Sequence, residues 1–174
     1  MKRLIAILVI LAAIISVTGC DTFDDVTYYA VLREETEFGH PSVADIGGVG
    51  VCEIPSLAEG ETMPELKNGD LIEIVFEKDA PIMECYPGRF AGYAKSIKVC
   101  YEGVTVVRGS SVTAYVFDLP ESIADAKVGD AVCYGDCNAE IIDVFEGRAT
   151  VGISINEGDF LKALAKGTLT LAKM

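Results

Sequence analysis

The chain has 174 residues, which is enough for one domain or for two small ones. It carries 27 acidic and 14 basic side chains, a net charge of −13. This acidity argues against nucleic acid as a partner, because phosphate binding needs lysine and arginine. The chain has no tryptophan and one histidine, which leaves few residues for general acid–base catalysis.

The first twenty residues differ in character from the rest. A short basic start, Met1-Lys2-Arg3, precedes the unbroken apolar run 4–15 and then Val17-Thr18-Gly19-Cys20. The apolar run is shorter than the roughly 20 residues that a membrane-spanning helix needs. It is typical of the central part of a signal peptide.

Small residues before a cysteine, directly after such a run, resemble the lipobox of bacterial lipoproteins. The resemblance implies cleavage between Gly19 and Cys20 and a diacylglycerol, with acyl chains such as palmitate, on the thiol of Cys20. Two acyl chains suffice for stable anchoring. By analogy with the family, Asp21 implies retention at the inner membrane, facing the periplasm, if the cell is Gram-negative. An ordinary secretory signal or an N-terminal membrane helix is the alternative.

We therefore expect a signal peptide over 1–19, a lipidated tether over 20–25 and a body on the outer face of the cell membrane. Without residues 1–19 the chain carries 12 basic and 27 acidic side chains, a net charge of −15. Such a body should not lie flat on anionic lipid, so its attachment is expected through the lipid anchor. The tether is short and acidic, which should keep the body close to the membrane.

Most of the remaining chain alternates between short β-rich segments and turns. We expect strands over 26–32, 47–54, 71–77, 82–86, 93–101, 104–107, 112–117, 131–134, 140–145, 149–155 and 168–172. Residues 34–42 and 55–68 are predicted as loops and 120–126 as one helical turn. A short helix is expected over 160–166, with Asp159 as its N-cap and Gly167 just after its end.

This pattern predicts an all-β, mainly antiparallel fold of small β-barrel, OB-like or sandwich modules with one short C-terminal helix. A parallel α/β fold is not expected, because the crossover helices are missing. The motif Lys-x-Gly-Asp recurs at 67–70 and 127–130, either through an internal duplication or because it makes a good turn. A division at 109–111 would give an OB-like domain over 26–108 and a second β-barrel-like domain over 111–174.

Two segments resemble known families. Residues 66–99, with Asn68-Gly69-Asp70, an alternating strand and Glu84-Cys85-Tyr86-Pro87, resemble small Gram-positive lipoproteins with an OB-like barrel, in which serine stands in place of Cys85. Residues 112–174, with Val128-Gly129-Asp130, the hairpin over 139–155 and the segment 164–171, are similar to the β-barrel domain of HlyD-type membrane fusion proteins. The second resemblance implies a structural module of an envelope assembly.

Five cysteines remain after lipidation: Cys52, Cys85, Cys100, Cys133 and Cys137. Export permits disulfides, and an odd number leaves at least one thiol unpaired. Cys133 and Cys137 flank a predicted turn and are the candidate disulfide; free buried thiols are the alternative. A zinc site built from this pair with Asp136 and His40 is not expected, because only one pair of ligands lies close in sequence.

No nucleophile elbow, metalloprotease motif or phosphate-binding loop is present, and the glycine-rich run 47–50 is followed by no predicted helix. Two acidic clusters, at 21–25 and 34–37, do not match a calcium-binding loop. An exposed-looking aromatic patch with one basic side chain is formed by Tyr86, Arg89 and Phe90. It lies in a loop between predicted strands, where OB-like barrels bind ligands. The alternative is a structural loop in which Tyr86 and Phe90 pack.

We therefore expect a membrane-anchored extracytoplasmic lipoprotein that is a non-enzymatic binding or envelope-assembly module, with an envelope protein as its partner. No catalytic residue, metal ligand or cofactor is predicted. A thiol-dependent exported enzyme, redox or hydrolase-like, and a divalent-cation-binding lipoprotein are the alternatives.

Overall fold

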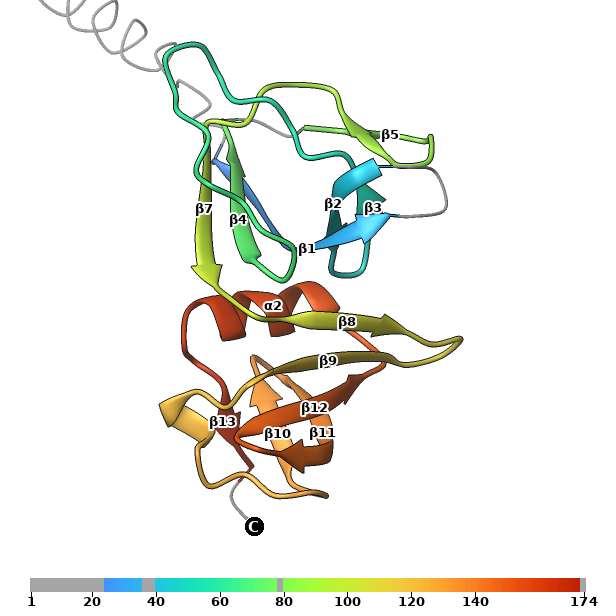
Figure 1. Cartoon of the computed structure of the whole chain (residues 1–174), viewed down its shortest axis with the longest axis vertical. Helices are drawn as coiled ribbons and strands as arrows, with labels where there is room; N and C mark the ends of the chain where they lie inside the picture. The colour runs from blue at the N-terminus through green and yellow to red at the C-terminus, as the bar shows by residue number, and fades with distance from the viewer. Residues whose placement is uncertain (1–23, 36–39, 78–79, 173–174) are drawn as a thin grey trace, which may run out of the picture.

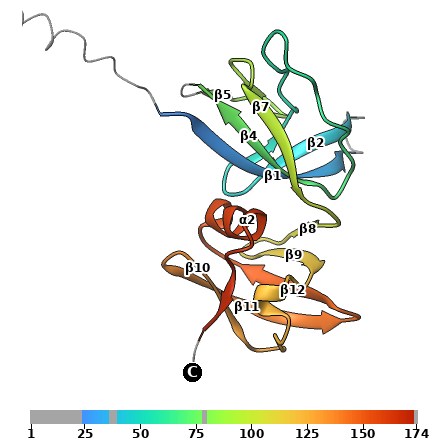
Figure 2. The same cartoon turned by 90° about the vertical axis from the view of Figure 1, so that its left-hand side faces the viewer.

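The structure is a computed structural model that describes residues 24–35, 40–77 and 80–172. The signal peptide, the lipidation site Cys20 and most of the tether lie outside the described residues. Two β-sheet halves are stacked along the long axis, with the helix α2 (Glu157–Ala165) between them, as Figure 1 shows. Figure 2 shows the same order from the side. The predicted all-β, mainly antiparallel fold with one short C-terminal helix is confirmed.

The first half is a five-stranded sheet in the order β3-β2-β1-β4-β7. Its strands are β1 (Val26–Glu35), β2 (His40–Ile46), β3 (Gly50–Cys52), β4 (Leu71–Phe76) and β7 (Ser96–Tyr101). Isolated parallel bridges join Cys52 to Gly88 and Leu57 to Ala94. The second bridge links the β3 side of the sheet to the β7 side, so that the sheet closes partly into an OB-like barrel.

The strand β4 shows how this barrel is filled. Ile72, Ile74 and Phe76 are buried, whereas Glu73 and Val75 between them are not. This alternation places one face of the strand in the core, as the sequence predicts. A separate hairpin of β5 (Ile82–Met83) and β6 (Arg89–Phe90) lies beside this sheet, so the predicted strand over 82–86 is much shorter than expected.

The second half is a six-stranded antiparallel sheet in the order β13-β10-β11-β12-β9-β8. Its strands are β8 (Thr105–Arg108), β9 (Thr113–Asp118), β10 (Ala131–Tyr134), β11 (Cys137–Phe145), β12 (Arg148–Ile153) and β13 (Thr170–Leu171), with a 3₁₀ turn η1 (Glu121–Ile123) after β9. Glu146 and Gly147 join β11 to β12 with φ values of 49° and 80°. Two successive positive φ values are those of the tight turn that fits hairpin twist, and the predicted hairpin is confirmed.

Helix α2 joins the two halves in one hydrophobic core. The ring of Phe160 lies 5.3 Å from that of Tyr115 and 5.6 Å from that of Tyr134, both in the second sheet. The same buried cluster contains Tyr29, Val31 and Leu71 of the first sheet. The two halves therefore bury their apolar surface against each other through α2.

The ends of α2 were predicted with mixed success. The helix begins at Glu157 with Asn156 as its N-cap, because the amides of Asp159 and Phe160 both donate to the Asn156 carbonyl. Asp159 therefore lies in the first turn, and its predicted N-cap role is wrong. Gly167 has a φ of 63°, and the amides of Gly167 and Thr168 donate to the carbonyls of Leu164 and Ala163. This is a Schellman motif, which confirms the expected position of Gly167.

Strand β2 is the largest departure from the predicted elements. The sequence predicts a loop over 34–42 and a strand over 47–54, whereas β1 continues to Glu35, β2 covers His40–Ile46 and 47–49 form a turn before β3. Val43, Ala44 and Ile46 are buried, and so is the charged Asp45 between them. A buried acid at this position interrupts the apolar pattern on which strand prediction depends.

The two Lys-x-Gly-Asp motifs form the same turn. The amides of Lys67 and Lys127 donate to the carboxylates of Asp70 and Asp130 at 2.7 and 2.8 Å. The glycine amide of the first turn donates to Leu32 of β1, which precedes it in the chain, and that of the second to Ile141 of β11, which follows it. The first turn thus binds a strand that precedes it in the chain, and the second binds a strand that follows it. This difference favours the interpretation that Lys-x-Gly-Asp makes a good turn over an internal duplication.

The change from one sheet to the other falls at 102–104, between β7 and β8. Residues 109–111, where the sequence predicts the division, form the turn between β8 and β9, in which the Gly109 amide donates to the Val112 carbonyl at 3.0 Å. Strand β8 therefore belongs to the second sheet.

Candidate functional site

A buried carboxylate lies where the two halves meet. The side chain of Asp45 in β2 is fully buried. It accepts hydrogen bonds from Arg33 Nε at 3.0 Å and from Arg108 Nε at 3.2 Å, and Arg108 Nη2 donates to its other oxygen. Two arginine side chains thus compensate the cost of removing one carboxylate from water. Arg108 contacts both oxygens of Asp45, in a bidentate arrangement. Arg33 comes from β1 in the first half and Arg108 from β8 in the second.

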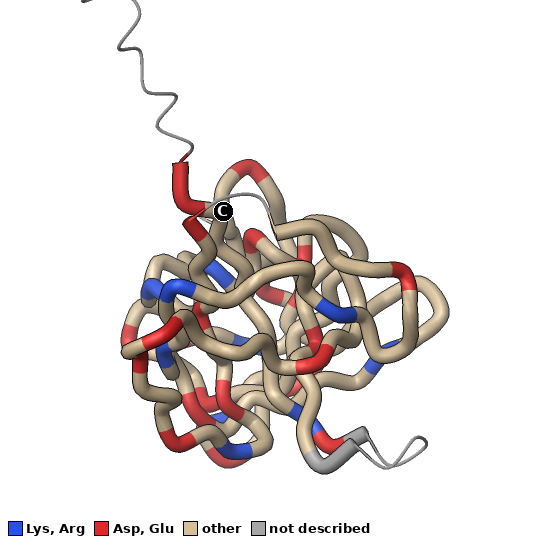
Figure 3. Tube along the Cα trace, turned by 90° about the horizontal axis from the view of Figure 1, so that it is seen from above, with Lys and Arg blue, Asp and Glu red and all other residues tan. Residues whose placement is uncertain are grey.

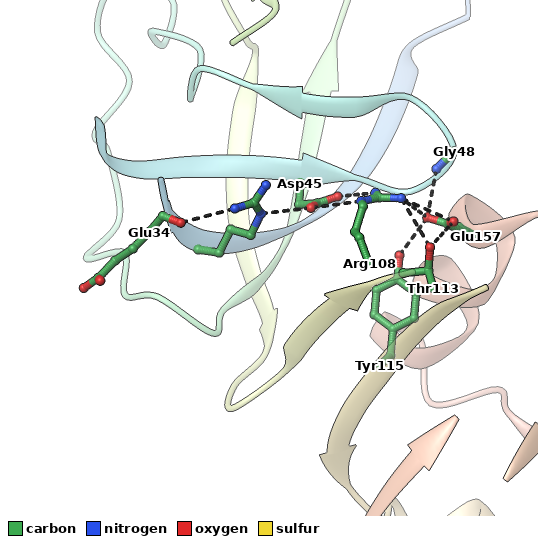
Figure 4. Close-up of polar contacts among 8 residues, drawn as sticks. Glu34, Asp45, Gly48, Arg108, Thr113, Tyr115 and Glu157 are labelled. Atoms are coloured by element: carbon green, nitrogen blue, oxygen red, sulfur yellow. Dashed lines mark hydrogen bonds and ion pairs between the residues drawn. The ribbon is translucent and has the colours of Figure 1, made fainter. Parts of the chain in front are cut away.

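Arg108 continues the network to the first turn of α2, as Figure 4 shows. Its Nη1 lies 3.1 Å from Glu157 Oε2. The Glu157 carboxylate also accepts hydrogen bonds from Thr113 Oγ1 at 2.6 Å, from the Tyr115 hydroxyl at 3.1 Å and from the Gly48 amide at 3.4 Å. The network therefore connects β1 and β2 of the first half to β8, β9 and α2 of the second.

The surroundings of Glu157 favour its ionised form. Burial alone would raise the pKa of Glu157, but the hydrogen bond from Thr113, the charge of Arg108 and the hydrogen bond from Tyr115 together lower it below its ordinary value. Burial raises the pKa of Tyr115, and the neighbouring charge of Glu157 raises it further. The Tyr115 hydroxyl therefore keeps its proton and acts as a donor.

The same arrangement leaves little capacity for catalysis. The carboxylates of Asp45 and Glu157 already accept several hydrogen bonds each, and the Tyr115 phenol stays protonated. A general base needs a free acceptor within reach of a substrate proton. The network is thus suited to fixing the two halves against each other.

A polar cleft opens beside the network, with a volume of about 630 Å³. Its walls come from β1, from the turn 47–49 and from the first two turns of α2, with Tyr29, Lys162 and Lys166 among its side chains. The turn approaches the helix so closely that a Cβ at Gly47 would lie 2.8 Å from the carbonyl carbon of Glu157. Glycine is therefore required where the β2–β3 turn meets α2.

The predicted binding loop divides into parts with different roles. The ring of Phe90 lies 4.9 Å from that of Phe76 and packs against the first-half core. Arg89 Nη2 lies 2.9 Å from Glu53 Oε1, and both Arg89 and Phe90 border a second cleft of about 530 Å³. Tyr86 is exposed and does not line that cleft. Phe90 thus follows the structural alternative, whereas Arg89 stays accessible.

The five described cysteines are all free thiols, and the strand register does not favour the predicted Cys133–Cys137 disulfide. Cys133 is paired with Asn138 across the β10–β11 hairpin, and Cys137 is paired with Tyr134. Paired residues share a face of the sheet and successive residues alternate between faces, so the two sulfur atoms point to opposite sides. A disulfide between them would need a shift of strand register.

The remaining thiols and metal ligands give no catalytic set. Burial raises the pKa of Cys52 to about 11 and also raises that of Cys100, which disfavours the reactive thiolate at both positions. His40 was considered as a zinc ligand, but its side chain is not among the side chains that the structure describes. Among the described residues, no three His, Cys, Asp or Glu side chains gather closely enough to hold a metal ion.

Uncharged residues of three adjacent strands, β8, β9 and β12, lie side by side on the outer face of the second sheet. Strand pairing places Val107 beside Ala114 and Gly152 in one row and Thr105 beside Val116 and Thr150 in the next. Val112 and Ile142 flank Gly152, since a Cβ there would lie 3.3 Å from Val112 Cγ1 and 3.7 Å from Ile142 Cγ2. We call these eight residues the uncharged face.

The uncharged face stands out against the rest of the surface. Val107, Val112 and Ile142 are 55%, 45% and 50% exposed. Ion-paired Arg148 and Asp118, which are paired across β12 and β9, border it on one side. Glu140 and Asp143 of β11, which are paired with Gly152 and Thr150, border it on another. In Figure 3, acidic residues occur throughout the trace seen from above, with fewer basic ones among them. Exposed apolar area of this kind is typical of contact surfaces.

Comparison with protein-family models, with curated protein sequences and with solved structures found no match to this chain. The resemblances to lipoproteins and to HlyD-type fusion proteins therefore stay predictions. Within the described part of the chain, no helix has the length and hydrophobicity of a membrane span.

Sequence reasoning missed the buried network entirely. Its signal was weak: Asp45 stands inside the short apolar stretch 43–46, where a charge needs a partner. The partners lie 12 residues away at Arg33 and 63 residues away at Arg108, and Glu157 lies 49 residues from Arg108. Only the folded topology brings them together.

Replacing Arg108 by alanine should destabilise the fold strongly. Asp45 would lose one of its two arginines while staying buried, and removal of one partner from a buried pair costs about 3–5 kcal/mol. We expect a loss near the lower value, because Arg33 remains. Urea unfolding of the mature chain measures it. Arg89→Ala, which removes an exposed pair with Glu53, is the matched control and should cost under about 1 kcal/mol. Equal losses in the two variants would contradict the structural role of the network.

Glu157 should make stability depend on acid pH. Its pKa in the folded protein lies below the ordinary value of 4.5, so the carboxylate stabilises the fold above that value, and the stabilisation is lost as the pH falls through the folded pKa. The free energy difference between wild type and Glu157→Gln should therefore be largest near pH 7 and shrink toward pH 3. The exposed variant Glu61→Gln is the control and should follow the wild type. A pH-independent difference for Glu157→Gln would contradict the pKa shift.

Proposed function

We propose that this protein is a membrane-anchored extracytoplasmic lipoprotein, lipidated on Cys20, that binds another envelope protein through the uncharged face and performs no catalysis. The observation that carries the binding proposal is this face. Eight neighbouring residues without charge lie together in a body whose expected net charge is −15. The anchor rests on the lipobox pattern of the sequence.

The position of β1 fits a short tether. The strand begins at Val26, and the lipidated residue would be Cys20. Since an extended chain spans at most about 3.5 Å per residue, the body would lie within about 20 Å of its anchor. The uncharged face belongs to the second half, which lies beyond the first half along the long axis.

The chemistry of the uncharged face favours a protein as the partner. It offers no charged group for a phosphate or a metal ion, and its side chains are short and apolar or neutral. Depletion of charge is the feature that marks the centre of protein–protein contacts. The surrounding acidic surface would repel other acidic proteins and lipids, so that contact is favoured where charge is absent.

The thiol-enzyme alternative gains little support. The buried carboxylates are fully engaged, and burial raises the pKa of two of the five thiols. An exported enzyme of this kind would have to use a more accessible cysteine.

The anchor is tested by Cys20→Ser. The variant lacks the thiol that a lipid donor would alkylate, so we expect it to leave the membrane fraction or to stay unprocessed. Metabolic labelling with a palmitate analogue and fractionation of the cells measure both effects. Cys85→Ser, at an exposed cysteine, is the matched control and should stay labelled and membrane-bound. Equal labelling of the wild type and Cys20→Ser would rule out the anchor.

The uncharged face is tested by a photo-crosslinking residue placed at Val107 or Ile142 of the full chain. We expect a crosslinked adduct of the same mass from both positions. The adduct should be lost in Val116→Asp, which adds a charge to the uncharged face. The control position is Val128, which is 62% exposed but lies in the Lys-x-Gly-Asp turn before β10. An equal adduct from Val128, or an adduct with a second copy of the chain, would contradict the proposed envelope partner.

A further inference from the structure

Two cysteines approach one peptide unit at the edge of the first barrel. Cys52 ends β3 and is 2% exposed. Gly88 is held beside it, because the Gly88 amide donates to the Val51 carbonyl at 2.9 Å and the Glu53 amide donates to the Gly88 carbonyl at 2.8 Å. A Cβ at Gly88 would lie 3.0 Å from Cys52 Sγ. The sulfur of Cys52 therefore rests against Gly88.

The second sulfur reaches the same peptide unit from the solvent side. Cys85 lies in the β5–β6 hairpin and is exposed. Its thiol donates to the Pro87 carbonyl, with Sγ and O 3.1 Å apart. The Pro87 carbonyl and the Gly88 Cα belong to one planar peptide group. Both sulfur atoms thus approach the Pro87–Gly88 peptide unit, that of buried Cys52 at Gly88 and that of exposed Cys85 at the Pro87 carbonyl.

We propose that Cys52 and Cys85 form a disulfide that ties the β5–β6 hairpin to β3 when the exported chain meets a disulfide donor. The approach of both sulfur atoms to one peptide unit agrees with a second observation. After burial, the nearby thiol of Cys85 is the next largest cause that raises the pKa of Cys52.

The exchange balances with one donor disulfide, RSSR. The exposed Cys85 thiolate attacks a donor sulfur, the donor S–S bond breaks, and one RS⁻ leaves and is protonated. Cys52 then gives up its proton and attacks the Cys85 sulfur, which expels the second RS⁻. Two protein thiols are oxidised to one disulfide, and the donor is reduced to two thiols. The second step should be the slower one, because the pKa of Cys52 is raised to about 11.

The bond would act on the segment that carries Tyr86 and Arg89. The β5–β6 hairpin pairs Ile82 with Phe90 and Met83 with Arg89, and it contacts β3 through the two backbone hydrogen bonds of Gly88. A covalent link from Cys85 to β3 would restrict this hairpin and so order the rim of the second cleft. The proposal does not depend on the lipid anchor or on the partner of the uncharged face.

The other three cysteines serve as internal controls. Cys133 and Cys137 point to opposite faces of their hairpin, and Cys100 lies in β7 of the first sheet. We therefore expect Cys100, Cys133 and Cys137 to remain thiols under conditions that oxidise Cys52 and Cys85.

The test is disulfide mapping of the full chain in detergent. The folded protein is incubated with oxidised glutathione, quenched in acid, alkylated with iodoacetamide and digested without reduction. We expect a linked peptide pair that contains Cys52 and Cys85, and alkylated peptides for the other three cysteines. A wild type that ends with glutathione on Cys85 and an alkylated Cys52, or with a different linked pair, would overturn the proposal.

Two variants give the chemistry a second readout. In Cys52→Ala the exchange should stop at a stable mixed disulfide of Cys85 with glutathione, because no second thiol is in reach. In Cys85→Ser, a substitution at the surface that should not affect folding, Cys52 should stay reduced. Oxidation of Cys52 in Cys85→Ser at the wild-type rate would show that Cys85 is not its partner.

Discussion

The burial of the Asp45 carboxylate is the constraint on which the arrangement of the two halves depends. A charge without water must be paired, since one left alone costs several kcal/mol. Arg33 satisfies it from the same half, but Arg108 comes from the other half and brings Glu157 with it. The β2–β3 turn must then lie against the start of α2, and Gly47 is needed at that contact because a Cβ would meet the helix backbone. One buried acid thus fixes the position of a strand, a turn and a helix.

The hydrophobic core stabilises the fold, but its contacts do not have the fixed directions of hydrogen bonds. Phe160 of α2 packs against Tyr115 and Tyr134, and the same cluster includes Tyr29 of the first sheet. Burial of apolar area drives such packing, but it does not choose among similar orientations. Hydrogen bonds of Asp45 and Glu157 have fixed donors and angles, so they select one orientation from those that the core permits. The energetic driving force and the specificity therefore come from different residues.

The sequence predicted the features that depend on neighbours along the chain. The alternation in β4, the tight turn at Glu146-Gly147 and the end of α2 at Gly167 each follow from local patterns, and each was predicted correctly. Strand β2 was missed because Asp45 looks unfit for a buried strand until its arginines are known. Chain spacing also does not reveal strand register. Cys133 and Cys137 are close in sequence but lie on opposite faces of their hairpin, whereas Cys52 and Cys85 are distant in sequence and approach one peptide unit.

The uncharged face also depends on strand register, and its composition supports the proposed role in binding. Alternation within β8, β9 and β12 predicts which residues point outward, but only the pairing places Val107, Ala114 and Gly152 in one row. In a body with this much negative charge, placing a charge at each outward position would favour solubility. Uncharged residues at adjoining outward positions of β8, β9 and β12 expose apolar area to water instead. An exposed valine at the centre of such a surface loses its contact with water when a second protein covers it, and the proposed anchor beside the membrane would raise the local concentration of that protein.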